Sequence, residues 1–264
     1  LQIGPNEGVS RVLHLDGVQE NEEKQTSRTN GTARAFRTKL PQQSAKSSSK
    51  ILGSAQNKAD VVRKPVPLIA QIWGKNPDNY YKTTKDLIKM GFDGVDINMG
   101  CPVKAVVKDG CCVALVDDRI LASEIIKATQ KAAKGKIPIS VKTRIGNRSV
   151  DMSWIEFLLK HNLDALTVHG RTAKQMSKVP ADWDKIGEAR ELRDRLSPAT
   201  KIIGNGDVLS RVEGMVLAKK YKLDGIMIGR GIFHDPFVFA NKSPWEDYSK
   251  AQKIKLYKKH VQLF

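Results

Sequence analysis

Cysteine is scarce in this chain, which has three in 264 residues, two of them adjacent at Cys111 and Cys112. These three cannot form a disulfide framework and include no C-x-x-C pair for zinc, so we expect no metal site and a reducing compartment, the cytoplasm. Long apolar runs are also missing. No run approaches the roughly 18 residues that a membrane-spanning helix needs, and the polar N-terminus has no signal-peptide core. The sequence therefore predicts a soluble protein without a membrane segment.

Acidic residues are too few to balance the basic ones. The chain has 28 Asp and Glu against 45 Lys and Arg, for a formal charge of +17 and a pI of about 9.8. Such an excess favours a polyanionic partner, nucleic acid above all. A basic proteome, or solubility by self-repulsion, would produce the same charge, so charge alone leaves the partner open.

Aromatic residues are nearly missing from residues 1–64, where Phe36 is the single example. This segment is rich in Gln, Asn, Ser and Thr and contains the low-complexity stretch Gln42–Lys50. Such a composition predicts a poorly ordered segment. It carries 11 basic and 6 acidic residues, so most of the positive charge belongs to residues 65–264.

From Pro65 onward, short apolar runs alternate with helical patterns. The six runs read as strands are Val66–Trp73, Gly94–Met99, Ile137–Lys142, Ala165–His169, Lys201–Gly204 and Gly225–Ile228. Strands alternating with amphipathic helices predict a parallel sheet, and polar residues just after the strands favour a (β/α)8 TIM-type barrel over an open sheet. The count is two strands short, and Val9–Val18 is the one strand-like stretch in the first 64 residues.

One thiol lies where chemistry is expected. The stretch Asp96-Ile97-Asn98-Met99-Gly100-Cys101-Pro102 ends a buried strand, so Cys101 would point into the barrel mouth. A thiol on a Gly/Pro-rich loop can serve as an acid or a nucleophile. A free cysteine is more often a small buried hydrophobe, and this motif alone does not decide between the two.

Polar residues at the other strand ends form a consistent set. They are Gln71, Lys142 and Arg144, His169 and Arg171, Asn205-Gly206-Asp207, and Gly229-Arg230. Taken singly, each could be a solvated rim charge or a structural side chain. Because parallel strands end on the same edge, the whole set predicts one site.

The last two motifs predict a phosphate anchor. Glycine-rich turns after the final strands, at Gly206 and Gly229-Arg230, present backbone N–H groups in the arrangement that barrels use for phosphate. Lys142 would be a cation near an electron-rich ring, and flavin mononucleotide fits both requirements. No G-x-G-x-x-G or P-loop is present, which argues against a Rossmann nicotinamide site or an NTPase.

From Leu68 to Phe239 the sequence resembles the tRNA-dihydrouridine synthases. The resemblance depends on Asn98-x-Gly-Cys-Pro102, Val168-His-Gly-Arg171 and Gly204-Asn-Gly-Asp207 in this order. It implies an FMN-dependent enzyme that reduces the C5–C6 double bond of particular uridines in tRNA, with NADPH as the reductant. Extrusion of a uridine into a barrel mouth, and the need to hold tRNA phosphates, would account for the basic charge.

The resemblance also implies roles for single residues. Cys101 would protonate C5 while the reduced flavin gives a hydride to C6, a task that suits a thiol acid near neutral pH. The residues that look like flavin contacts are Gln71, Lys142, His169, Asn205, Gly206, Asp207, Gly229 and Arg230. The substrate-side groups would be Asn98, Arg144 and Arg171. Cys111 and Cys112, where the family has a Gly-Ala-Gly-rich turn, are interpreted as small packing residues.

The domain plan departs from the family at both ends. We expect an atypical segment over 1–64, an FMN-binding barrel over 65–240, and over 241–264 the beginning of a helical tRNA-binding domain, here a basic helix at Trp245–Phe264. The family's Ala-Pro-Met and Glu-containing motifs are not recognisable before Leu68, and residue 1 is Leu, so we expect a fragment of a longer gene. The protein would act as a monomer.

Two alternatives stay open. The chain could be a truncated, non-catalytic RNA-binding remnant, given the missing first strands and its basic charge. It could also be another FMN barrel oxidoreductase that acts on a small pyrimidine such as dihydroorotate. Flavin binding would distinguish an enzyme from the RNA-binding remnant. Salt-dependent tRNA affinity would distinguish a tRNA-dihydrouridine synthase from an oxidoreductase of small pyrimidines.

Overall fold

A computed structural model describes residues 2–3, 9–12 and 67–262 of the chain. Residues 1–17 and 66–264 belong to one unit, and a second unit, residues 18–65, lies outside the described residues. The expectation of a poorly ordered segment over 1–64 therefore falls on residues that, apart from 2–3 and 9–12, lie outside the described part of the chain. Within that segment the structure describes two short strands, β1 (Gln2–Ile3) and β2 (Val9–Val12).

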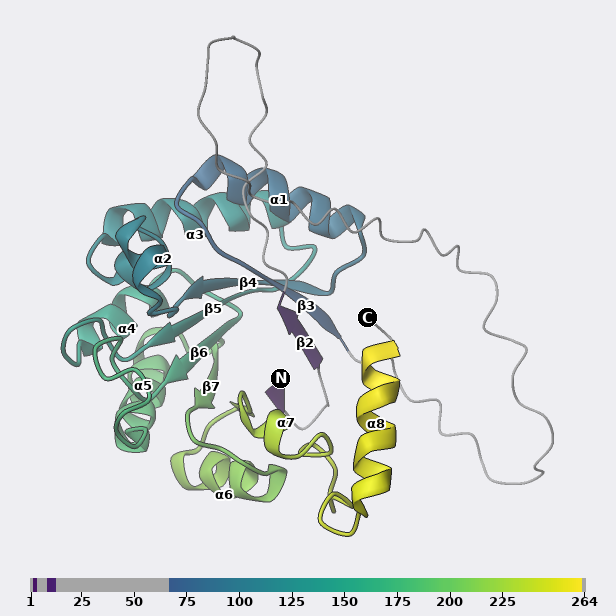
Figure 1. Cartoon of the computed structure of the whole chain (residues 1–264). Helices are drawn as coiled ribbons and strands as arrows, with labels where there is room; N and C mark the ends of the chain where they lie inside the picture. Colours follow the sequence, from purple (N-terminus) through teal and green to yellow (C-terminus); the bar gives the residue numbers. More distant parts are fainter. Residues whose placement is uncertain (1, 4–8, 13–66, 263–264) are drawn as a thin grey trace, which may run out of the picture. The chain divides into compact units, whose positions relative to one another are not determined.

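The described strands form one sheet in the order β1-β8-β7-β6-β5-β4-β3-β2. Strands β2 to β8 are parallel, and β1 pairs antiparallel with β8. Figure 1 shows β2 to β7 of this sheet. β2 lies inside Val9–Val18, as expected, and pairs with β3. The other strands are β3 (Leu68–Ile72), β4 (Gly94–Met99), β5 (Ile139–Arg144), β6 (Ala165–His169), β7 (Lys201–Asn205) and β8 (Gly225–Met227).

Helices connect successive parallel strands. Those in the connections are α1 (Pro77–Lys89), α2 (Lys104–Lys108), the 3-10 helix η1 (Cys112–Val116), α3 (Arg119–Ala133), α4 (Met152–Leu159), α5 (Trp183–Leu196) and α6 (Arg211–Tyr221). After β8 come α7 (Gly231–His234) and α8 (Lys250–Gln262). This alternation of parallel strands and helices confirms the predicted α/β fold of the TIM-barrel class.

Four of the connecting helices begin where a short polar side chain accepts the backbone N–H three residues later. Asp118, Asp151, Asp182 and Ser210 cap α3, α4, α5 and α6, and each accepts the amide three residues later. Each cap satisfies one of the amides that a helix N-terminus leaves without a partner. In these four helices a polar residue of the sequence therefore marks where the helix starts.

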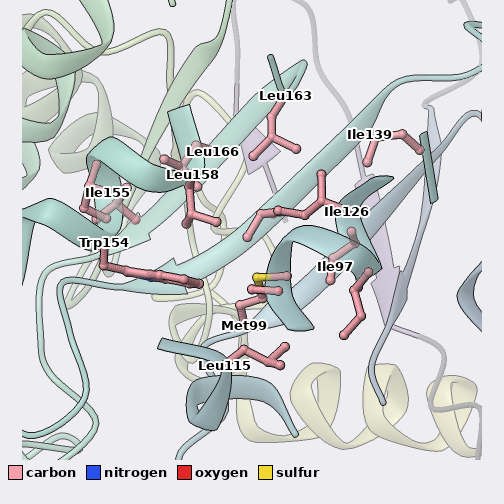
Figure 2. Close-up of a cluster of buried hydrophobic side chains, with 14 of the residues drawn as sticks. Ile97, Met99, Leu115, Ile126, Ile139, Trp154, Ile155, Leu158, Leu163 and Leu166 are labelled. Atoms are coloured by element: carbon pink, nitrogen blue, oxygen red, sulfur yellow. The ribbon is translucent and has the colours of Figure 1, made fainter. Parts of the chain in front are cut away.

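The main core lies between the sheet and the helices that cover it. Figure 2 shows part of it, in which Trp154 and Leu158 of α4 and Ile126 of α3 lie among strand residues such as Ile97 and Leu166. All five are fully buried. Cys111 and Cys112 are also buried, as packing residues would be.

Two sequence-based expectations for this layer are wrong in detail. The strand expected at Ile137–Lys142 is β5, which begins at Ile139, after Pro138, and continues to Arg144. Val212, Met215 and Val216 have the i, i+3, i+4 spacing that predicts a helix face packed on the sheet, but in α6 they are 63%, 50% and 62% exposed. The side of α6 that faces β8 contains Gly214, where an added Cβ would come within 3.3 Å of Ile226. Contact through a glycine sets the rotation of this helix and overrides the apolar spacing.

The last helix is basic and lies apart from the core. α8 covers most of the expected helix Trp245–Phe264, and none of its described residues is buried. The helical spacing of Ile254, Tyr257 and Val261 predicts one apolar side, but these residues are 45%, 68% and 53% exposed. Whether α8 begins a tRNA-binding domain over 241–264 stays a prediction. Among the described helices, none is both long and apolar enough to cross a membrane.

Candidate active site

A cavity of about 530 Å³ opens at the carboxyl ends of β5, β6, β7 and β8. Nine of the twelve predicted site residues line it: Lys142, Arg144, His169, Arg171, Asn205, Gly206, Asp207, Gly229 and Arg230. The cavity also borders residues that the sequence did not single out, among them Ser177, Met227 and His234. A single cavity therefore unites the strand-end motifs of the second half of the sheet.

The lining is strongly cationic. Lys142, Arg144, Arg171 and Arg230 border the cavity, and Asp207 is the one carboxylate among the described lining residues. Asp207 forms an ion pair with Arg171, whose side chain is 4% exposed, and lies 3.9 Å from Arg230. The remaining positive charge favours an anionic ligand, such as a phosphate group.

Arg171 sets the state of His169. Its Nη1 donates to His169 Nε2 at 3.2 Å. A guanidinium can only donate, so Nε2 is the acceptor and the neutral ring has its proton on Nδ1. Burial, with Lys142, Arg144 and Arg171 nearby, lowers the pKa of His169 to about 2. His169 is therefore an uncharged hydrogen-bonding group in this cationic site.

The surroundings of Lys142 lower its pKa, although the side chain stays mostly protonated at pH 7. Burial lowers the pKa of Lys142 to about 8, Asp96 opposes this shift, and Arg144 reinforces it. Lys142 lies in β5 opposite Asn98 in β4. It therefore lies between the residues that line the cavity and the predicted site residues on β3 and β4. A cation whose pKa is this low can hold a developing negative charge and can also exchange a proton near neutral pH.

The two glycine-rich turns differ in their surroundings, and the turn at Gly229 leaves room for a ligand. Gly206 has φ +133° and packs so tightly that a Cβ would lie 2.5 Å from the Ala181 side chain. A Cβ on Gly229 would instead meet no atom within 4 Å, so the backbone there borders open space of the cavity. Asn205 Nδ2 donates to the Met227 carbonyl at 2.8 Å and joins the two turns.

The other three predicted residues, Gln71, Asn98 and Cys101, lie at the carboxyl ends of β3 and β4. Asn98 Nδ2 donates to Gln71 Oε1 at 3.0 Å, and Asn98 Oδ1 accepts the amides of Gly100 and Cys101, both at 3.0 Å. Cys101 is partly exposed and has a free thiol. It is close enough to Lys142 for its charge to affect that residue's pKa, so the two groups of residues belong to one site.

Arg144 holds two loops of the site through hydrogen bonds to their backbone carbonyls. Its Nε donates to the Gly100 carbonyl at 2.8 Å, and its Nη1 donates to the carbonyls of Thr172 and Met176 at 3.1 and 3.2 Å. Arg171 Nε likewise donates to the Val179 carbonyl, at 2.6 Å. Both guanidiniums, predicted as substrate-side groups, therefore hold loop backbone, and their contact with a substrate stays a prediction.

Sequence reasoning assigned no role to Asp96. Its side chain is 7% exposed and accepts hydrogen bonds from Gln71 and Ser140. The available signal was a carboxylate in the middle of an otherwise apolar parallel strand. Such a group is buried only when it is fully hydrogen-bonded.

The pKa of His169 predicts a pH-dependent stability. An unfolded histidine has a pKa near 6.5, so between that value and about 2 the unfolded chain binds one more proton at this residue than the folded chain. The free energy of unfolding should therefore fall as the pH drops below about 6.5, by up to about 1.4 kcal/mol per pH unit. Urea unfolding at pH 7 and pH 5 measures the slope. His169→Gln should reduce it, and an equal slope in both proteins would contradict the assignment.

Comparison with known proteins agrees with this geometry. The family model described as dihydrouridine synthase matches residues 41–263. A probable tRNA-dihydrouridine synthase of Staphylococcus aureus (strain Mu50 / ATCC 700699) is 44% identical over 200 residues, which are 75% of this chain and 60% of that one. A probable tRNA-dihydrouridine synthase 2 of Bacillus subtilis (strain 168) is 43% identical over 199 residues, with the same coverage. The chain thus spans about three fifths of the length of these curated relatives.

A solved structure shows the same fold at low sequence identity. The crystal structure of DHODH from Eimeria tenella in complex with ferulenol aligns with a TM-score of 0.50 and 14% identity, over 66% of this chain and 55% of that one. This likeness concerns the fold alone. The family model covers most of the chain and the two relatives are 44% and 43% identical to it, so the chain belongs to the dihydrouridine synthase family.

Proposed function

We propose that this chain is the barrel part of a tRNA-dihydrouridine synthase, which reduces the C5–C6 double bond of uridines in tRNA with FMN as the cofactor and NADPH as the reductant. The observation that carries the proposal is the position of Cys101, on a hydrogen-bonded loop beside a cation-lined cavity. Family membership and the names of the relatives support it.

The residues present fit a flavin mononucleotide. Arg230 and the open backbone at Gly229 suit the phosphate, and Gly206, Asn205 and Asp207 border the same space. Lys142 and the neutral His169 lie deeper along the strand ends and can donate hydrogen bonds to a ring. When bound, the flavin supplies the hydride that goes to C6 of the uridine.

The chain supplies the proton and the geometry. The Cys101 thiol gives its proton to C5, and hydride and proton together complete the reduction. Asn98 and Arg144 fix the backbone that carries this thiol, through the Gly100 and Cys101 amides and the Gly100 carbonyl. A general acid held in place before reaction contributes about 10²–10⁴-fold to a rate.

The charge distribution suits tRNA as the substrate. The chain has a formal charge of +17, and α8 carries five lysines and no carboxylate. Such groups neutralise phosphates and release counterions, so affinity should weaken as salt increases. A tRNA-modifying role places the protein in the cytoplasm.

Absorption spectroscopy of the purified chain after gel filtration, followed by assay with unmodified tRNA and NADPH, tests the proposal. Bound flavin and new dihydrouridine are expected. A chain that binds tRNA but neither retains nor takes up FMN would overturn the enzyme and favour the RNA-binding remnant. A flavin-loaded chain that reduces free pyrimidines and ignores tRNA would favour the small-pyrimidine oxidoreductase.

A further inference from the structure

A row of polar side chains crosses three neighbouring strands inside the sheet. Gln71 in β3, Asp96 in β4 and Ser140 in β5 are register partners. Asp96 Oδ2 accepts from Gln71 Nε2 at 2.7 Å, and Oδ1 accepts from Ser140 Oγ at 2.6 Å. The row places a buried carboxylate with both oxygens engaged directly below the site.

The row continues to the loop that carries Cys101. Because Gln71 directs its NH2 group at Asp96, its Oε1 faces the other way and accepts from Asn98 Nδ2 at 3.0 Å. Asn98 then has its Oδ1 left for the amides of Gly100 and Cys101. The two side-chain amides thus lie in series between the carboxylate and the loop backbone.

The bond directions in this series are set at its two ends, by a carboxylate that accepts and by backbone N–H groups that donate. A carboxylate only accepts, whereas a side-chain amide can be turned to donate or accept at either end. With an acceptor at Asp96, Gln71 and Asn98 each have one favourable orientation. Reversing them would turn the Asn98 NH2 group toward the backbone N–H groups of Gly100 and Cys101, where donors would face donors.

We propose that Asp96 is a positioning residue for Cys101, because it sets the orientation of Gln71 and Asn98 and thereby anchors the loop amides. The proposal rests on the proposed function, in which the Cys101 thiol delivers the proton. The carbonyl side of the loop has separate anchors, because Arg144 Nε donates to Gly100 O and Thr143 Oγ1 donates to Met99 O at 3.1 Å. Loss of the amide anchor should displace the thiol without unfolding the loop.

Asp96→Asn tests this, because asparagine has the same size and can both donate and accept. We expect kcat for tRNA reduction, measured at saturating FMN, to fall at least tenfold, with the KM for tRNA within about twofold of wild type. The rate at which iodoacetamide alkylates Cys101, followed by peptide mass spectrometry, should change at least threefold. The alkylation rate does not depend on tRNA chemistry, so it tests the positioning even if the wild type forms no dihydrouridine.

A double-mutant cycle separates positioning from general destabilisation. If Asp96 acts through Asn98, Asp96→Asn should change the alkylation rate less than 1.5-fold in an Asn98→Ala background. Multiplicative effects of the two changes, or an Asp96→Asn protein with wild-type kcat and alkylation rate, would overturn the proposal. If Asp96→Asn does not fold, Gln71→Met breaks the same series of hydrogen bonds. The alkylation rate of Cys101 in the flavin-free Gln71→Met protein should then change at least threefold. A wild-type alkylation rate in that variant would overturn the proposal.

Thr129→Val is the matched control. Thr129 is fully buried on α3, and its Oγ1 donates to the Ile125 carbonyl at 2.8 Å. The variant removes one buried hydrogen bond and has no connection to the series. It should leave both kcat and the Cys101 alkylation rate as in wild type. Equal changes in Thr129→Val and Asp96→Asn would show that lost stability, and not positioning, causes the effect.

Discussion

Replacing Cys101 with alanine should slow tRNA reduction by about 10²–10⁴-fold, the usual contribution of a positioned general acid. Alanine cannot supply the proton to C5, but it keeps the backbone amide that donates to Asn98 Oδ1. The loop should therefore keep its shape, and FMN retention should be unchanged. Flavin reoxidation by tRNA, followed by rapid mixing, measures the rate, and the absorption spectrum measures the bound flavin.

Cys111→Ala is the control for that change. Cys111 is buried, and its thiol lies 3.8 Å from Asp109 and outside the lining of the cavity. It should reduce tRNA at nearly the wild-type rate. If Cys101→Ala were as active as Cys111→Ala, Cys101 would not be the proton donor, and another acid in the site would have to replace it.

Replacing Trp154 with alanine should lower the free energy of unfolding by about 3–5 kcal/mol. Trp154 is fully buried on α4, stacks on Phe157 with ring centroids 5.4 Å apart, and donates from Nε1 to Thr143 Oγ1 at 2.8 Å. The variant would leave a cavity in the core beside β5, the strand that carries Lys142 and Arg144. Urea unfolding, with equal slopes for wild type and variant, measures the loss.

Two further variants, each with a smaller expected loss of stability, serve as comparisons for Trp154→Ala. Trp154→Phe keeps a ring but loses the bond to Thr143, so its loss should be smaller. Phe233→Ala removes a side chain that is 83% exposed and should change stability by no more than about 0.5 kcal/mol. Equal urea midpoints for Trp154→Ala and Phe233→Ala would show that Trp154 does not support the core.

The alternation of strands and helices could be predicted from the sequence, because buried parallel strands are short apolar runs between polar turns. β4 and β6 have the expected bounds. β5 does not have the expected bounds. The apolar run begins at Ile137 and includes Pro138, whereas the strand begins at Ile139 and ends in polar residues. Arg144 lies beyond the expected end of this strand at Lys142, but it pairs with His169 of β6, and its side chain borders a polar cavity and not the core.

The site could be predicted as a set of residues but not as a set of contacts. Parallel strands end on one edge, so nine strand-end residues share a cavity. The partners of Arg144 and Arg171 include backbone carbonyls of distant loops, which no local pattern encodes. Asp96 was missed for the same reason, since its partners lie 25 and 44 residues away.

The parallel pairing of the strands has a consequence for folding. Each pairing closes a long loop: Gln71 and Asp96 are 25 residues apart, Asp96 and Ser140 are 44, and Asn205 and Met227 are 22. Loop closure costs entropy before its contacts form, and parallel neighbours cannot form local hairpins, so this part of the sheet assembles from strand–helix–strand units. The cavity draws on β5, β6, β7 and β8, so it is complete only after the last of these units has joined.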